Sequence, residues 1–436
     1  MFGDSHSTTA QSHGGQTLTI DVERPVKADP PVVGKAPMRG RRWPRVPWLA
    51  RFLPLDADVR RALLLTLVWE VVTDLVGRAA SLLIQPNKGD TSAGVVRQLF
   101  PGEHLNHFES IWLRWDGNWY TLLGSHGYGS HVSGLDAFFP AYPLLIHVVG
   151  FLLGGRYLLA GILINRLLLF PTVVVFTKLV RRDGAGDGRE TELAPLMILL
   201  IPGGVFLLAA LTETLFVFAC LAAMLAIRRE RWLLAAAACA LATGTRLPGV
   251  VAVGMLGLEL LLRREWVKAV YCSAIGMAGI GLFSLYTLVT QHDLLAFKDA
   301  YKHGSWNDQS FTLNVLRGPL RYYHELLQDP PTKDYGGTVT FGYLVALVSV
   351  VVLAVLCFRR LSWPLRLFVA GTALIPLLSG SMFSYYRYAL IPLLPMMVLA
   401  TRWLAERPLW RDSVKLVLAG VAIFDIMAFT SGHWVS

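Results

Sequence analysis

Apolar runs separated by short polar linkers occupy most of the chain after residue 58. A helix needs about 20 apolar residues to span the hydrocarbon core of a bilayer, with a range of roughly 17–25. Several of the runs reach that length and others are shorter. The pattern predicts an all-α polytopic integral membrane protein, with apolar segments at about 59–84, 140–153, 157–180, 194–211, 213–227, 232–247, 249–262, 268–290, 339–357, 364–381, 388–404 and 414–431.

Two polar stretches, at about 85–137 and 291–338, are too long to be turns. Long connections in a compact architecture are usually functional or disordered. The short linkers, such as 228–231 and 359–366, are rich in arginine and lysine, whereas the basic residues of the two long stretches are sparse and mixed with acids. Because short basic linkers stay in the cytoplasm, we expect both long stretches to be large outer loops.

The number of membrane crossings follows from this assignment. Seven apolar runs separate the two outer loops, but loops on the same side require an even number of crossings. The run at 140–153 is short and begins with Pro140 and Pro143, so we expect a re-entrant segment that protein buries. This gives eleven spans, with the N-terminus inside and the C-terminus outside. In the alternative, 140–153 is a true span and Arg181 and Arg182 face outside.

Composition supports the membrane class and defines the tail. Hydrophobic residues make up 54% of the chain and charged residues 16%, against roughly 25% charged in soluble domains, which excludes a soluble globule. The net charge of +10 lies in clusters between apolar runs, so it indicates cytoplasmic faces rather than nucleic-acid binding. We expect residues 1–58 to be a disordered basic cytoplasmic tail and 59–436 to be the transmembrane domain. The four cysteines show no metal-ligand spacing, so we expect neither a disulfide nor zinc.

The first outer stretch contains one carboxylate among aromatic residues. Asp116 follows Arg114 and Trp115 and precedes Trp119 and Tyr120. Apolar surroundings disfavour the charged form of a carboxylate and suit it to accept a proton from a hydroxyl. We therefore interpret Asp116 as a general base at the membrane surface. The alternative is an interfacial aromatic belt in which Asp116 is paired only to Arg114.

Three further charged residues are expected on the same outer side. Glu213 begins an apolar run, where it could bind a sugar hydroxyl or a cation, or cap the helix. Arg246 lies at membrane depth, which marks a functional site by default. Arg387 stands beside Tyr388 at the start of a span and suits a phosphate, unless the tyrosines are only interfacial anchors. Together with Asp116, these residues fit a substrate that carries a phosphate and a hydroxyl.

Charged residues inside the apolar runs support a rival interpretation. Glu70, Asp74 and Arg78 lie four residues apart, so they share a helix face that we expect to pair internally and to point into the protein. With Arg166 in a later run, they would suit a transporter or lipid flippase. Against this, the two halves lack matching interrupted helices. No Walker loop, HExxH or Gly-rich dinucleotide motif occurs, so we expect no nucleotide-driven chemistry and no cofactor.

Five short motifs follow one another along the chain. They are Arg114-Trp115-Asp116 with Tyr120 and Gly127-Tyr128, Phe138-Phe139-Pro140 with Tyr142-Pro143, Thr212-Glu213-Thr214-Leu215-Phe216, Ala242-Thr243-Gly244-Thr245-Arg246, and Arg387-Tyr388-Ala389-Leu390. Each motif is weak alone, but the ordered set is fairly specific, and over about 110–405 it resembles the PIG-V family of membrane mannosyltransferases. The resemblance implies a GT-C-type helical bundle with its site at the outer face and a polyprenyl-phosphate sugar as donor.

The resemblance also implies roles for particular residues. Asp116 would be the catalytic base, and Arg387, with Arg246, would hold the donor phosphate. We expect mannose to pass with inversion from polyprenyl-phosphate mannose to a hydroxyl of a glycolipid or glycan acceptor, outside a bacterial plasma membrane and without a metal. Another sugar is the alternative within this class. The remaining expected substrate contacts are Arg114, Trp115, Tyr120, Glu213 and Tyr388.

Overall fold

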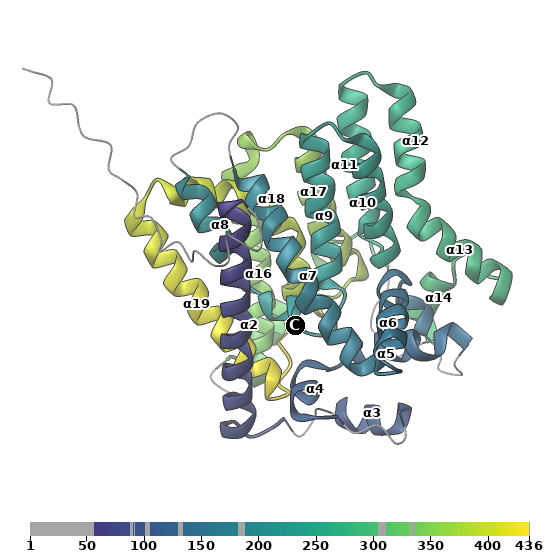
Figure 1. Cartoon of the computed structure of the whole chain (residues 1–436), viewed down its shortest axis with the longest axis vertical. Coiled ribbons are helices and arrows are strands. Elements are labelled where there is room, and N and C mark those ends of the chain that lie inside the picture. The colour runs from purple at the N-terminus through teal and green to yellow at the C-terminus, as the bar shows by residue number, and fades with distance from the viewer. Residues whose placement is uncertain are drawn as a thin grey trace, which may run out of the picture. The chain divides into compact units, whose positions relative to one another are not determined.

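The computed structural model describes residues 56–87, 90, 92–100, 105–129, 134–181, 188–303, 311–331 and 335–435. The expected tail, 1–58, lies almost wholly outside these residues. Within them every regular element is a helix (Figure 1), so the all-α prediction is confirmed.

The helices follow the predicted apolar runs closely in most cases. The longer helices are α2 (Ala57–Leu83), α7 (Tyr157–Val180), α9 (Glu213–Arg228), α16 (Tyr335–Cys357), α18 (Tyr385–Ala405) and α19 (Pro408–Thr430). The shorter ones are α6 (Ala141–Leu152), α8 (Arg189–Leu199), α10 (Trp232–Thr245), α11 (Gly249–Leu262), α12 (Trp266–Gly276), α13 (Ala278–Gln291) and α17 (Trp363–Leu374).

Three predicted runs are interrupted rather than continuous. In the run 194–211, α8 ends at Leu199 and the chain passes through Pro202 and the left-handed Gly203 into a 3-10 turn, η3 (Gly204–Leu207). The run 268–290 is split into α12 and α13, which are bent by 48°. The run 364–381 ends in a second 3-10 turn, η5 (Ile375–Ser379), which contains Pro376. Apolar composition alone therefore overestimated helix continuity at these points.

Helix length bears on the number of spans. Among the described residues, four helices are long and apolar enough to cross a membrane, namely α7, α16, α18 and α19, and the bent pair α12–α13 would be a fifth. At 1.5 Å per residue, the 12-residue α6 is about 18 Å long, well below the roughly 30 Å of hydrocarbon. This length suits the expected re-entrant segment, while the total of eleven spans stays a prediction.

The two polar stretches are largely helical. The first contains α3 (Ser92–Leu99), α4 (His107–Trp112), α5 (Asp116–His126) and the short turns η1 (Gly127–Gly129) and η2 (Leu135–Ala137). The second contains α14 (Ala296–His303) and α15 (Arg317–Gln328). Helix α5 packs on α6 and α7, so the segment that begins at Asp116 is anchored to the apolar bundle.

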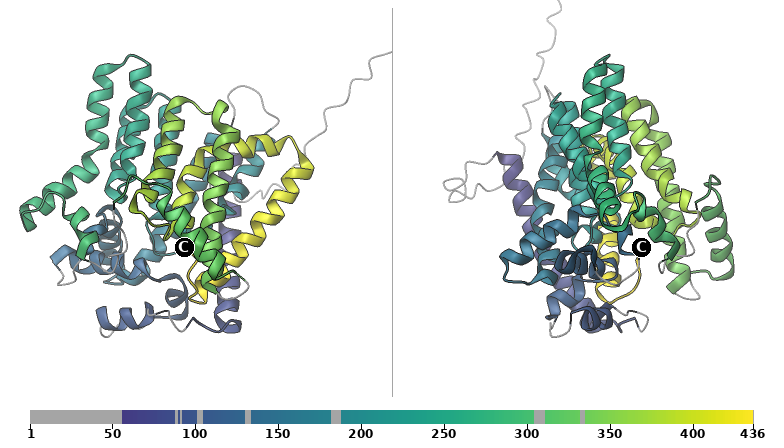
Figure 2. Two further views of the ribbon diagram at one scale, coloured as in Figure 1. Left: turned by 180° about the vertical axis from the view of Figure 1, so that it is seen from behind. Right: turned by 90° about the vertical axis from the view of Figure 1, so that its right-hand side faces the viewer.

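Packing between helices positions the charged residues. Helix α7 contacts both α9 and α18, and α17 contacts both α11 and α18. These helices are labelled in Figure 1, and Figure 2 shows the whole chain from behind and from the side. Helix α10 crosses α13 so closely that a Cβ on Gly279 would clash with the Gly244 nitrogen. Since α9 runs away from Glu213 and α10 returns to Arg246, these two residues meet at the same end of the helix pair.

Candidate active site

Four charged side chains at the ends of four helices form one connected cluster. Arg387 donates from Nη1 to Asp116 Oδ2 at 2.7 Å and from Nε to Glu213 Oε1. Arg246 donates from Nη1 to the same Oε1 of Glu213. The cluster therefore runs Asp116–Arg387–Glu213–Arg246 and has no net formal charge.

Each member of the cluster lies at the end of a helix. Asp116 and Glu213 are the first residues of α5 and α9, where the helix dipole favours an acid. Arg246 follows the last residue of α10, and Arg387 lies in the first turn of α18. The Leu247-Pro248 step after Arg246 separates α10 from α11 and lets the chain reverse at this depth.

Burial within the cluster is uneven. The side chain of Glu213 is fully buried, and that of Arg387 is 4% exposed. The side chain of Asp116 is 28% exposed. A buried charge is tolerated only when it is paired and hydrogen-bonded, which explains why Glu213 lies between two guanidinium groups. Asp116 is thus the carboxylate that a hydroxyl could approach.

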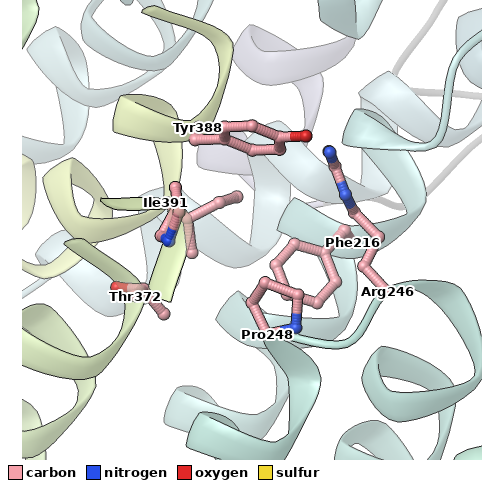
Figure 3. A pocket seen from close by; sticks show the side chains of 7 residues that line it. Phe216, Arg246, Pro248, Thr372, Tyr388 and Ile391 are labelled. Atoms are coloured by element: carbon pink, nitrogen blue, oxygen red, sulfur yellow. The ribbon is translucent and has the colours of Figure 1, made fainter. Parts of the chain in front are cut away.

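A small pocket adjoins Arg246. Its lining comes from α9, α17, η5, α18 and the turn before α11, and consists of Phe216, Arg246, Pro248, Thr372, Pro376, Tyr388 and Ile391. The Arg246 guanidinium lies 4.9 Å from the centre of the Tyr388 ring, a cation–π arrangement, and Figure 3 shows both side chains above Pro248. The walls are mainly apolar, so the charge available to a ligand here is that of Arg246.

Tyr120 packs behind the cluster. It lies on α5 one turn after Asp116, is 5% exposed, and makes edge contacts with Phe138 and Tyr142. Its hydroxyl lies 3.5 Å from the hydroxyl of Thr212, the residue before Glu213. Burial raises the pKa of Tyr120 to about 12, so this phenol stays protonated at neutral pH.

The alternative pairing of Asp116 with Arg114 and the alternative of a snorkelling Arg387 are wrong. Asp116 is paired with Arg387, while Arg114 pairs with Asp90 and donates to the Thr430 carbonyl at 2.7 Å. Arg387 is buried and bonded to two carboxylates, so it does not snorkel. The motifs did not identify Asp90, because an aspartate 24 residues upstream of Arg114 in a polar stretch has no distinguishing local pattern.

The other intramembrane charges form a separate cluster. Asp74 accepts hydrogen bonds at 2.8 Å from Arg166 on α7 and from the Trp112 indole on α4. The expected pairing of Asp74 within its own helix is therefore replaced by a bond between helices. Glu70 is partly buried, whereas Arg78 is exposed, so the expectation that all three point into the protein is wrong for Arg78.

The helical fold and the buried charged cluster define a polytopic membrane protein with an enzyme-like site at the ends of its helices. Residues 58–271 match the family model described as Mannosyltransferase (PIG-V). This region is similar to the PIG-V mannosyltransferases, so the resemblance recognised in the motifs is confirmed over residues 58–271. Asp116, Glu213 and Arg246 lie inside the matched region, and Arg387 lies beyond it.

Individual relatives agree with the family match. A stretch of 156 residues is 33% identical to the GPI alpha-1,6-mannosyltransferase 2 of Cricetulus griseus and also to that of Rattus norvegicus. Identity to the corresponding protein of Mus musculus is 31% over the same length. The match covers 33% of this chain and 30% of each relative, so the chain spans less than a third of the length of these relatives.

Proposed function

We propose that the protein is a membrane mannosyltransferase that moves mannose, with inversion, from polyprenyl-phosphate mannose to a hydroxyl of a glycolipid or glycan acceptor. The observation that carries the proposal is the joining of a partly exposed carboxylate, Asp116, to two arginines through buried ion pairs. The match of residues 58–271 to mannosyltransferases supports it. The site would face the outside of the plasma membrane, as the distribution of basic linkers predicts.

The reaction assigns a task to each group. The acceptor oxygen attacks the anomeric carbon and passes its proton to Asp116, acting as general base. The bond between the anomeric carbon and the phosphate oxygen breaks, and the polyprenyl phosphate leaves with the bonding electron pair. Arg387 and Arg246 stabilise that developing charge, because guanidinium groups bind phosphate oxygens through paired donors.

The remaining predicted residues would shape the site. Glu213 would hold both guanidinium groups in place, since it accepts a hydrogen bond from each. Tyr388, against Arg246, and Tyr120, behind Asp116, would contact the substrate or support those that do. Arg114 and Trp115 precede the base and would fix the start of α5.

Donor binding would change the partners of Arg387. Nη1 of Arg387 is occupied by Asp116 in this structure, so a donor phosphate competes with that carboxylate. When the phosphate takes Arg387, Asp116 is released from that ion pair and can accept the proton of the acceptor hydroxyl.

The test is transfer of radiolabelled mannose from synthetic polyprenyl-phosphate mannose into lipid and glycan extracts by purified protein. Wild type should transfer label, and Asp116→Asn should lose transfer while folding normally. Asp136→Asn is the matched control, because Asp136 lies in the same polar stretch and bonds Gln291 instead of the cluster. Near-normal transfer by Asp116→Asn would remove the general-base assignment, and failure of wild type to bind the donor would refute the donor class.

A further inference from the structure

The end of α19 and the residues that follow it, 429–435, fold back onto the chain just before Asp116. Its Thr430 carbonyl accepts a hydrogen bond from Arg114 Nη2 at 2.7 Å, and its Ser431 carbonyl accepts one from the Asn87 N–H at 3.2 Å. At Gly432 the φ angle is +81°, and a Cβ there would lie 2.7 Å from Asp90 Oδ2. Glycine is thus required where the segment passes the Arg114–Asp90 pair.

Trp434 ties this segment to the second half of the bundle. Its indole N–H donates to the Tyr343 hydroxyl at 2.8 Å, and its carbonyl accepts from the Tyr335 hydroxyl at 2.8 Å, both on α16. Its ring stacks on Phe383, four residues before Arg387, with centroids 5.1 Å apart. Such hydrogen bonds and ring contacts fix an indole in one orientation.

The same indole meets Trp115 edge to face, with centroids 4.7 Å apart. Trp115 has φ 47° and ψ −116°, a conformation that costs free energy in a residue other than glycine and persists only where the surroundings hold it. A second edge contact, with Phe429 at 5.0 Å, and a hydrogen bond from the Trp115 N–H to Ser92 Oγ at 3.1 Å complete its environment. The next residue is Asp116.

We propose that Trp434 is a positioning residue for Asp116. Its indole packs against the strained Trp115 and holds that residue in place. Because Trp434 also packs on Phe383, it links the start of α5 to the start of α18, where Arg387 lies. The hydrogen bonds and ring contacts of Trp434 go to Tyr343, Tyr335, Phe383 and Trp115 rather than to the charged cluster, so Trp434 acts through Trp115. The inference rests on the proposed function for its catalytic consequence, while the ordering of Trp115 by Trp434 can be measured independently.

The first test separates turnover from binding. Trp434→Ala should lower kcat roughly 10- to 100-fold, as expected when a catalytic group is misplaced by about 1 Å, with KM for the donor little changed. Trp434→Phe retains an aromatic ring and should recover most of the loss. Trp410→Ala is the matched control, because Trp410 lies on α19 and is 60% exposed. A fall in apparent kcat no larger than the measured loss of folded protein would indicate a purely structural role and overturn the proposal.

A double-variant cycle then identifies the residue through which Trp434 acts. In an Asp116→Asn background the base is already absent, so adding Trp434→Ala should cause little further loss of the residual activity. Multiplicative losses would mean that Trp434 acts elsewhere, and would overturn the assignment.

Hydrogen exchange decides the matter without an activity assay. Amide exchange across residues 113–120 should accelerate in Trp434→Ala and stay at the wild-type rate in Trp410→Ala. If wild type transfers no mannose but this acceleration is seen, the proposed function is refuted, while the ordering of Trp115 by Trp434 is supported. If the exchange rates are unchanged in Trp434→Ala, Trp434 does not order Trp115, and the proposal is overturned whatever the activity.

Discussion

Replacing Glu213 with glutamine tests whether the charged cluster is held together by its buried carboxylate. The side chain of Glu213 is fully buried, and its Oε1 accepts hydrogen bonds from both Arg387 and Arg246. Glu213→Gln keeps the size of the side chain and removes its charge. Arg387 would keep Asp116 as a partner, whereas Arg246 would lose its carboxylate.

The expected cost follows from burial. Breaking a buried ion pair by removing one partner destabilises a protein by about 3–5 kcal/mol, because the other charge stays buried without compensation. The Arg246 side chain is 12% exposed, so solvent offers little relief. Glu192→Gln provides the comparison, since Glu192 pairs with Arg61 at 3.0 Å but is 50% exposed, and exposed pairs contribute about 0–1 kcal/mol.

The assay is denaturant unfolding in detergent micelles followed by tryptophan fluorescence, comparing wild type, Glu213→Gln and Glu192→Gln. A third variant, Glu213→Gln with Arg246→Gln, removes the uncompensated cation and should recover part of the lost stability. The reasoning is refuted if the two single variants cost the same free energy, or if the double variant is less stable than Glu213→Gln alone.

Three further changes have expected outcomes. Arg387→Lys should abolish most mannose transfer in the radiolabel assay, because one ammonium cannot reproduce the two separate donors that Arg387 directs at two carboxylates; near-normal transfer would contradict this. Gly279→Ala should prevent accumulation of folded protein, because its Cβ would clash with the Gly244 nitrogen. Gly281→Ala, in open space on the same helix, should be tolerated in expression and unfolding assays. The raised pKa keeps Tyr120 protonated in the folded state between pH about 10 and about 12, while the unfolded chain loses that proton, so the free energy of unfolding falls over this range. Tyr120→Phe should weaken that fall. An unchanged slope in pH-dependent unfolding would count against it.

The sequence predicted helix positions well because apolar runs in a membrane protein are almost all helices. It predicted α7 and α11 with their observed limits, yet it could not place the interruptions after Leu199 or at Met277. Breaks within an apolar run depend on how neighbouring helices pack, which hydropathy does not contain. The same limit hid the bond between Asp74 and Arg166, whose partners lie 92 residues apart.

The candidate site residues could be identified because charged residues within apolar and aromatic sequence are few, and burying them in a membrane costs free energy. That rule selected Asp116, Glu213, Arg246 and Arg387, which the structure brings into contact. It could not select Trp434, because one more tryptophan in a membrane protein is unremarkable by composition. Its contacts with Trp115 and Tyr343 become evident only when distant segments are packed together.

The helix interruptions and the charged cluster are two aspects of one arrangement. The polar groups of non-helical backbone inside a membrane protein must be hydrogen-bonded by other parts of the protein. The backbone of the interruption before α9 has such partners. Asn165 on α7 donates to the Leu211 carbonyl at 2.6 Å, and Thr214 donates to the Leu207 carbonyl at 2.6 Å. The bundle thereby tolerates a helix that begins at Glu213 rather than running past it. A continuous helix would place this carboxylate along its side, whereas a helix end directs it at the arginines from α10 and α18.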